Sequence, residues 1–296
     1  MKFVLVVNPQ SGKKQSAKIL DLVKPVFDSQ GAEVSIIRTG FPGHARDISR
    51  SLDLAGYSGF LVLGGDGTFN EVVNGMFARS DGKRFPIGLI PGGSGNSLLH
   101  DLGLVDPVAA AGAIVAGHTR LIDAAQIQMN GNEQYSTNLI GWGLVTDVGK
   151  RAEKLRWIGA SRRYTAASII EIFLKKHRQA KLIIDDEPHV KNFTFVVACN
   201  SIHVGNGMKM APYADLDDGL IDILVVDANI TRVRLLSVLP KLFDGTHVNE
   251  PEVEYYRASS FSLIPETDDI LNIDGEMTGN TPIRVKMLKQ CIQIFA

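Results

Sequence analysis

The stretch LVLGGDGTFNEVVNG, residues 61–75, constrains the fold more than any other part of this sequence. An apolar run that is typical of a buried strand ends in a glycine-rich turn, and a helical pattern begins at Thr68. Ordering a glycine costs more backbone entropy than ordering any other residue. Three of them, Gly64, Gly65 and Gly67, therefore indicate that side chains must be absent from this turn. A helix N-terminus behind such a turn predicts a phosphate site, because its N–H groups and its dipole attract anions.

Asp66 lies inside this turn, and its charge needs an explanation. A carboxylate would repel a phosphate unless a divalent cation lay between them, or unless Asp66 accepted a proton from an attacking hydroxyl. The alternative is a tight turn in which Asp66 bonds its own backbone. The letters TFNE also predict a capping box, with Thr68 at the N-cap and Glu71 reaching back to it.

Strands and helices alternate over the first third of the chain. We expect strands at 2–8, 32–39, 59–65 and 85–93, and helices at 13–31, 42–56, from 68 and at 96–103. This order predicts a mostly parallel, Rossmann-like α/β sheet with helices on its faces. Such a sheet binds ligands at the carboxyl ends of its strands, where Asn8, Thr39 and two glycine turns occur.

From about residue 122 the pattern changes to short β-type runs between turn signals. We expect a mainly antiparallel β domain, interrupted by helical pieces near 161–178 and 231–243. The predicted domains are therefore an α/β domain at 1–121 and a β-sandwich at 122–296. The last residues are candidates to pack back on the first domain.

Composition narrows the class of protein. The net charge of −1 and the lack of a long basic run argue against a nucleic-acid partner. No apolar stretch approaches the roughly 18 residues of a membrane span. The two cysteines, Cys199 and Cys291, form no disulfide or metal pattern, which favours a reducing compartment. We expect a cytoplasmic protein that meets membranes only from the side.

A second turn, IGLIPGGSGNSLLHDLG at residues 87–103, repeats the strand, glycine turn and helix of the first. This turn and the motifs VVNPQSGKK, GGDGTFNEVVNG, MKMAPYADLDDGLIDILVV and NIDGE occur in one chain. With them the sequence resembles the lipid kinase superfamily of sphingosine kinases, ceramide kinases and diacylglycerol kinases. The resemblance covers essentially the whole chain.

This resemblance implies an α/β nucleotide-binding domain, a β-sandwich lipid-binding domain and an active site in the cleft between them. It also implies ATP and Mg²⁺ as cofactors. The nucleotide-binding residues it indicates are Asn8, Thr39, Gly64, Gly65, Gly67, Thr68, Asn70, Glu71, Gly93, Ser94 and Asn96. The catalytic candidates are Asp66, Asp274 and Glu276, and the resemblance leaves open which acid accepts the hydroxyl proton. Taken alone, the letters IDGE would predict only a hairpin turn.

Two further sites follow from the resemblance. In the acidic loop ADLDDGLID, it implies a structural magnesium ion at Asp215, Asp218 and Leu220, with a solvated turn as the alternative. Residues 141–164 resemble sphingosine kinases more than bacterial diacylglycerol kinases, and Asp147 matches the acid that meets a sphingoid amine. A carboxylate suits an ammonium in an apolar tunnel. The alternative is an ordinary helix-capping aspartate.

The stretch 151–178 is strongly basic and contains Trp157. It predicts contact with an anionic membrane surface, and the alternative is a helix with one solvated face.

The sequence therefore predicts an ATP- and Mg-dependent lipid kinase, with a sphingoid base as the first acceptor and diacylglycerol as the second. The partners expected are the lipid and a membrane surface. A soluble metabolite kinase similar to NAD kinases and a non-catalytic lipid or nucleotide sensor are the alternatives. Whether the chain forms a homodimer stays open.

Overall fold

The structure is a computed structural model that describes every residue of the chain except 13, 156, 158–159 and 206. Lys13 of the VVNPQSGKK motif therefore lies outside the described residues. The same holds for residues 156 and 158–159 of the basic stretch.

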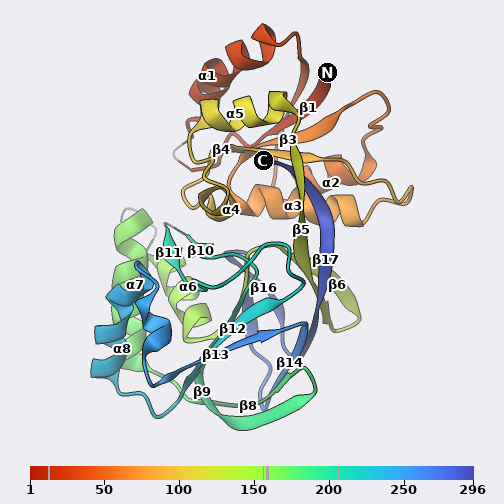
Figure 1. Cartoon of the computed structure of the whole chain (residues 1–296). Helices are drawn as coiled ribbons and strands as arrows, with labels where there is room; N and C mark the ends of the chain where they lie inside the picture. Colours follow the sequence, from red (N-terminus) through yellow and green to blue (C-terminus); the bar gives the residue numbers. More distant parts are fainter. Residues whose placement is uncertain (13, 156, 158–159, 206) are drawn as a thin grey trace. The chain divides into compact units, whose positions relative to one another are not determined.

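The chain divides into two compact units (Figure 1). The first contains Met1–Asp123 and Gln290–Ala296, and the second contains Ala124–Lys289. The long last strand, β17 (Ile283–Phe295), supplies residues to both units. Ile294 pairs with Ile87 in the first unit, and Ile283 pairs with Leu263 in the second.

The first unit is built on a parallel sheet. Its strands are β1 (Lys2–Val7), β2 (Glu33–Arg38), β3 (Gly59–Gly64) and β4 (Ile87–Pro91). They lie in the order β2-β1-β3-β4, and each neighbouring pair is parallel. Their carboxyl ends therefore lie along one edge, as the alternating pattern predicts.

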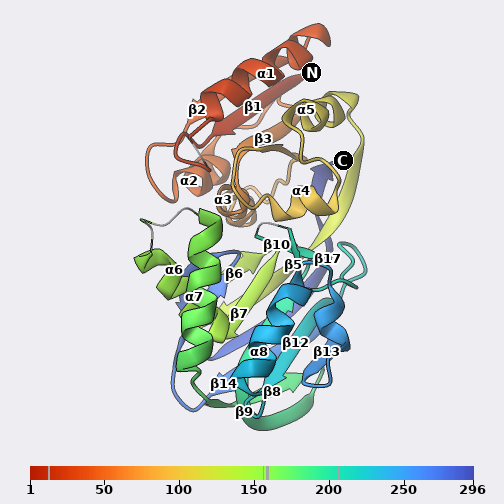
Figure 2. The ribbon, with the colours of Figure 1, turned by 90° about the vertical axis from the view of Figure 1, so that its left-hand side faces the viewer.

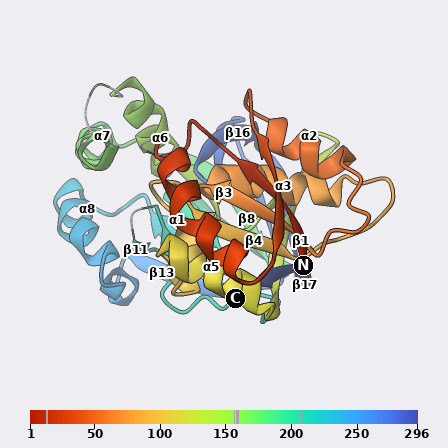
Figure 3. The same cartoon turned by 90° about the horizontal axis from the view of Figure 1, so that it is seen from above.

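Helices cover both faces of this sheet (Figures 1 and 3). The helices are α1 (Ser16–Ser29), α2 (His44–Ser51), α3 (Asp66–Phe77), α4 (Ser97–Asp101) and α5 (Pro107–Ala116). Alternate side chains of β1, such as Phe3 and Leu5, pack with Phe27 of α1 and Ile114 of α5. Helices α2 and α3 lie against each other on the opposite face (Figure 1). Burial on both faces explains why β1 and β3 are continuous apolar runs.

The second unit is a β-sandwich. Its strands are β5 (Thr119–Met129, which begins in the first unit), β6 (Asn132–Ser136), β7 (Leu139–Gly143), β8 (Arg178–Ile184), β9 (Glu187–Cys199), β10 (His203–Val204), β11 (Met208–Lys209), β12 (Ile221–Asp227), β13 (Val253–Ala258), β14 (Ser260–Pro265), β15 (Ile270–Ile273), β16 (Glu276–Asn280) and part of β17. The first part of β9 pairs with β8, and its last part pairs with β7 and β12. One long strand thus joins the two layers, and residues such as Trp142, Phe193 and Phe261 fill the core between them.

Among its described residues this unit has the α-helices α6 (Leu144–Lys154), α7 (Ala160–Leu174) and α8 (Arg232–Val238), followed by the 3₁₀ helices Leu239–Leu242 and Thr246–Asn249 (Figure 2). Ile172, Val226 and Leu235 form an apolar contact among α7, β12 and α8. The sequence pattern predicts α7 and α8 but not α6. None of the helices in the described residues is long and apolar enough to cross a membrane.

The contact between α2 and α3 yields a test of the fold. A methyl group on Gly75 would lie 1.8 Å from Ser49 Oγ and 2.3 Å from the carbonyl oxygen of Arg46. Gly75→Ala should therefore push the helices apart and lower the free energy of unfolding by about 1–3 kcal/mol. Gly112→Ala in α5 is the control, because its added methyl group meets nothing within 4 Å beyond the neighbouring residues and the backbone of α5 itself. That change should stabilise the protein by about 0.4–1 kcal/mol. Urea unfolding compares the two, and equal midpoints would contradict the packing argument.

Candidate functional site

The predicted loops meet at the carboxyl edge of the parallel sheet. The loops after β1, β2 and β4 each begin with a backbone hydrogen bond to the neighbouring strand. Asn8 N–H donates to the Leu63 carbonyl at 3.0 Å, and Thr39 N–H donates to the Val7 carbonyl at 2.9 Å. Gly92 N–H donates to the Gly64 carbonyl at 2.8 Å. These bonds fix the loops after β1, β2, β3 and β4 in one row.

The two glycine turns touch each other through their backbones. A Cβ on Gly93 would lie 2.4 Å from the Cα of Gly65, and a Cβ on Gly65 would lie 2.9 Å from the Cα of Gly93. Gly12 of the first loop joins them, since its Cβ would lie 2.5 Å from the carbonyl oxygen of Gly92. Close approach, not an unusual φ angle, thus requires glycine at positions 65 and 93.

Asp66 connects the starts of two helices. It is the first residue of α3, and its Oδ1 accepts from the Ser97 N–H of α4 at 2.7 Å. Its Oδ2 accepts from Ser97 Oγ at 3.2 Å. A carboxylate is stabilised at this position because both helix N-termini carry partial positive charge. The acid in the glycine turn therefore holds the second turn in place.

The predicted capping box at Thr68 and Glu71 is wrong. Helix α3 begins at Asp66, two residues earlier than expected, so Thr68 already lies in its first turn. Thr68 Oγ1 accepts from Asn8 Nδ2 at 2.9 Å, which joins the first and third loops. Gly65 is the N-cap and has no side chain to accept from the N–H groups at the start of α3. These donors are suited to an anion.

Glu71 caps a different helix. Its two carboxylate oxygens accept from the N–H groups of Gly43 at 2.9 Å and Ala45 at 3.1 Å, at the start of α2. This ties the loop after Thr39 to α3.

The remaining predicted nucleotide residues lie in or beside the same turns. Asn96 is in the left-handed region with φ 53°, and its side chain bonds both the N–H and the carbonyl of Gly93 at 3.0 and 3.1 Å. Ser94 is exposed in the second turn. The side chain of Asn70 accepts from Asn74 Nδ2 at 3.2 Å within α3, and Gly67 lies in the first turn of that helix.

In the second unit, Asp274 is buried in a ring of donors. Its Oδ1 accepts from Ser136 Oγ at 2.6 Å and from the N–H groups of Asn138 and Leu139 at 3.0 and 2.9 Å. Its Oδ2 accepts from the Thr137 N–H at 3.0 Å. Asp274, with φ 50°, and the next glycine form the two-residue turn between β15 and β16. The hairpin reading of IDGE is thus correct, and Asp274 also orders the β6–β7 loop.

Glu276 follows this turn at the start of β16, and its side chain is exposed. The two acids of the motif therefore have opposite environments.

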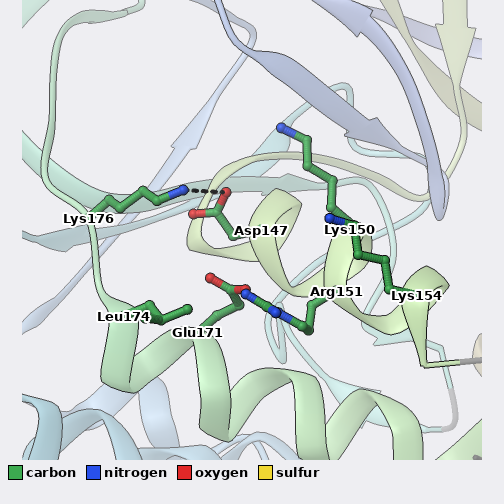
Figure 4. A pocket seen from close by; sticks show the side chains of 7 residues that line it. All are labelled: Asp147, Lys150, Arg151, Lys154, Glu171, Leu174 and Lys176. Atoms are coloured by element: carbon green, nitrogen blue, oxygen red, sulfur yellow. Dashed lines mark hydrogen bonds and ion pairs between the residues drawn. The ribbon is translucent and has the colours of Figure 1, made fainter.

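Asp147 lies in α6 and is buried at 7% exposure. Arg178 Nη2 donates to both its oxygens, at 2.9 and 2.8 Å. The same guanidinium donates through Nε to Asp269 Oδ2 at 3.0 Å. Lys176 Nζ lies 3.9 Å from Asp147 Oδ1 (Figure 4). The carboxylate expected to meet a lipid amine thus already has a cationic partner within the protein.

The acidic loop expected to hold magnesium contains an arginine ion pair. Asp218 accepts from the Leu220 N–H at 2.8 Å and pairs with Arg257, while Asp215 is exposed. Arg257 Nε also lies 3.6 Å from Asp222 Oδ1. Among the described residues, no group of three His, Cys, Asp or Glu side chains could hold a metal ion. Arg257 thus pairs with one of the predicted ligands, Asp218, and the magnesium role of this loop stays a prediction.

Comparisons with known proteins agree with this arrangement. Residues 2–127 match the diacylglycerol kinase catalytic domain, and residues 138–296 match the YegS C-terminal NAD kinase beta sandwich-like domain. The chain is 30% identical to a diacylglycerol kinase of Mycobacterium tuberculosis, over 99% of this chain and 94% of the relative. It is 32% identical to sphingosine kinase 1 of Arabidopsis thaliana, over 93% of this chain and 68% of the relative.

The chain belongs to the lipid kinase family with a diacylglycerol kinase catalytic domain.

Solved structures support the same fold for this lipid kinase. A putative diacylglycerol kinase from Bacillus anthracis matches with a TM-score of 0.81 at 25% identity, over 99% of this chain and 96% of that one. An NAD kinase from Archaeoglobus fulgidus in complex with ATP has a TM-score of 0.51 at 13% identity, which shows likeness of fold alone. The predicted α/β domain followed by a β-sandwich is thus confirmed.

Sequence reasoning missed several partners in this lipid kinase. Ser97, Arg178, Asp269 and Arg257 were not singled out, although each binds a predicted site residue or its neighbour. For Ser97 a signal existed, because a polar residue begins the helix after the second glycine turn. For Arg178, 31 residues after Asp147, local spacing carries no such signal.

The acidic loop also makes stability depend on pH. Burial raises the pKa of Asp222 to about 6, against opposing effects of the Tyr255 hydroxyl and Arg257. The unfolded chain ionises near the ordinary pKa of 3.8, so unfolding releases a proton between about pH 4 and 6. This group therefore lowers the free energy of unfolding by about 3 kcal/mol as the pH rises through that window.

Asp222→Asn removes the titrating group, so the variant should not lose stability as the pH rises. The free energy of unfolding of Asp222→Asn, relative to that of the unaltered protein, should therefore rise from pH 4 to pH 7. Urea unfolding at four pH values measures the difference. Asp28→Asn, on the exposed side of α1, is the control, and its difference should stay constant. A constant difference for Asp222→Asn as well would show that Asp222 is ionised when buried.

Proposed function

We propose that this lipid kinase transfers the γ-phosphoryl group of ATP, supplied as its magnesium complex, to a lipid hydroxyl, and that the acceptor is a neutral lipid of the diacylglycerol type. The observation that carries the phosphotransfer is the backbone contact between the two glycine turns at the N-terminus of α3. Behind this contact lies the positive end of a 12-residue helix that no side chain caps, which suits an anion. Phosphoryl transfer depends mainly on such positioning and charge stabilisation.

In this proposal the nucleotide phosphates lie against the turn Gly64–Thr68 and against Gly93 and Ser94. Asp66 positions the second turn through Ser97. Asn8, Thr68 and Glu71 hold the surrounding loops to α3. Removing any of these contacts would weaken the fold and would also displace the backbone N–H donors that position the phosphates.

We infer that Glu276 accepts the hydroxyl proton. A carboxylate offers about four lone-pair sites, and Asp274 already receives four hydrogen bonds. Both oxygens of Asp66 accept from Ser97. Glu276 is the exposed member of the three acids, so a substrate hydroxyl can reach it. Asp274 then acts as a positioning residue for the turn that carries Glu276.

This assignment predicts different defects for two neighbouring acids. Glu276→Gln should lower kcat by about 10²–10⁴-fold with little change in unfolding, because it removes a proton acceptor from an exposed position. Asp274→Asn should lower the free energy of unfolding by about 1–3 kcal/mol, because its amide cannot accept from all four donors. Kinase assays and urea unfolding on the same preparations measure both. Glu266→Gln, another exposed glutamate of this unit, is the control. Full activity in Glu276→Gln would contradict this assignment and would favour Asp66 as the acceptor of the hydroxyl proton.

The neutral acceptor is supported by the charges around Asp147. Arg178 occupies both carboxylate oxygens, and Lys176 lies beside them. A lipid ammonium would enter a region that already carries balancing cations, whereas a glycerol hydroxyl would meet no such repulsion.

A sphingoid base is the second candidate acceptor. It is favoured by the identity with the Arabidopsis sphingosine kinase 1 and by the position of Asp147 after Trp142 and Gly143. For this acceptor the ammonium would have to share Asp147 with Arg178.

The acceptors can be separated with γ-labelled ATP and micelles that contain diacylglycerol, sphingosine or ceramide, with NAD as a soluble comparison. We expect label on diacylglycerol, with a KM that changes less than twofold in Asp147→Asn. Asp269→Asn is the matched control, since it also removes one carboxylate from Arg178. The second candidate would be established instead if sphingosine carried the label and its KM rose about tenfold in Asp147→Asn but not in Asp269→Asn. Label on NAD alone would overturn the lipid assignment.

We also propose that the enzyme works at a membrane surface. Exposed apolar side chains gather on α7, where Ile170, Phe173 and Leu174 are 38%, 60% and 52% exposed, and Trp157 before it is 81% exposed. Basic residues flank them along the chain, including Lys154 and Lys176. An apolar helix face beside cations is typical of peripheral membrane contact.

A further inference from the structure

The loop between β2 and α2 carries a pair of stacked rings beside the candidate nucleotide site. Phe41 and His44 lie with their ring centroids 4.5 Å apart and their ring planes 11° from parallel. The loop starts at Thr39, whose N–H donates to Val7 at the end of β1. The rings therefore follow directly on the edge of the sheet where the predicted loops meet. The proposed phosphate contacts do not involve them.

A tight turn sets the geometry of the two rings. The letters FPGH, residues 41–44, place proline and glycine at the two central positions of a type II turn. The structure agrees, because Gly43 has φ 86° and ψ −9°, and His44 N–H donates to the Phe41 carbonyl at 3.2 Å. Such a turn brings its first and fourth residues together, so the two rings can stack.

Further bonds hold this turn to the phosphate loops. Gly40 N–H donates to His44 Nδ1 at 3.0 Å, which fixes the imidazole against its own loop. Glu71 of α3 accepts from the Gly43 N–H at 2.9 Å. Glu71 lies roughly 7.5 Å along α3 from Asp66, at a rise of about 1.5 Å per residue. The ring pair is therefore preorganised a short distance from the helix end that suits a phosphate.

Phe41 is open to solvent although one of its faces is covered. The residue is 58% exposed. Because His44 lies against one ring face, this exposure belongs mainly to the other face and to the ring edge. A flat apolar surface of this kind suits a planar aromatic ligand. The base of a nucleotide is such a ligand, since every base has a π-face that can stack on an aromatic side chain.

We propose that Phe41, supported by His44, stacks on the base of the nucleotide whose phosphates lie against the glycine turns. The inference rests on the proposed function and adds the residue that recognises the nucleoside part of the phosphoryl donor. Phe41 is then a specificity-determining residue, because it distinguishes a nucleoside triphosphate from a donor that consists of phosphates alone. His44 is a positioning residue, since it acts through the ring of Phe41.

The experiment compares the binding of two ligands to the full chain by calorimetry, without lipid. The ligands are the magnesium complexes of ATP and of inorganic tripolyphosphate. Phe41→Ala should weaken ATP binding by about 5–150-fold, the range that stacking of a base on an aromatic ring gives. It should leave tripolyphosphate binding unchanged, because that ligand has no base.

Two further variants control this comparison. Phe41→Tyr keeps the ring and should bind ATP as the unaltered protein does. Phe243→Ala is the matched control, because it removes a phenylalanine that is 59% exposed but belongs to the second unit. Its binding of both ligands should be unchanged. Circular dichroism of each variant checks that the fold is retained.

Two results would overturn this inference alone. Unchanged ATP affinity in Phe41→Ala would show that the base does not contact this ring. Equal weakening of ATP and tripolyphosphate binding would make Phe41 a support of the phosphate loops. If the unaltered protein bound neither ligand, the proposed phosphoryl transfer from ATP would fail together with the inference.

Discussion

The contact between the backbones of Gly65 and Gly93 is the constraint on which the candidate nucleotide site depends. A methyl group at either position would overlap the Cα of the other, so the turns can touch only as two glycines. Their contact brings the start of α4 to Asp66, which then fixes it through Ser97. A third loop joins at Gly12. Glycine at these positions thus lets the loops pack together at the N-terminus of α3, where no side chain caps the helix.

Acids that look alike in the sequence have different physical roles. Asp66 and Glu71 each satisfy N–H groups at the start of a helix other than their own. Asp274 satisfies a whole loop from inside a hairpin turn. Such carboxylates stabilise the backbone because each accepts from donors that would otherwise be buried without a partner. Glu276 differs from these acids, because its side chain is exposed directly after the same turn.

The order of strand and helix patterns along the sequence predicted the parts of the fold that depend on neighbouring residues. The βαβ alternation predicted the parallel sheet, and the parallel direction placed Asn8, Thr39 and the glycine turns at one edge. The capping box failed because Glu71 could bond a helix 26 residues earlier as well as its own. Local spacing cannot reveal this choice, since the N–H groups of Gly43 and Ala45 lie 28 and 26 residues from Glu71 along the chain. Helix α6 was missed because it follows the β-type run of β7 with no intervening loop, and it packs against β7 and α7.

The ion pair at Asp147 shows why one acid does not decide a substrate. Arg178 bridges Asp147 and Asp269, and its side chain is only 16% exposed. An ammonium that took over Asp147 would leave this guanidinium with Asp269 as its remaining carboxylate, in surroundings that already contain Lys150 and Lys176. Separating a largely buried ion pair is costly, because both charges lose a partner that water replaces poorly. A neutral hydroxyl leaves the pair intact. The proposed choice of acceptor therefore rests on the balance of charge around the carboxylate and not on the carboxylate alone.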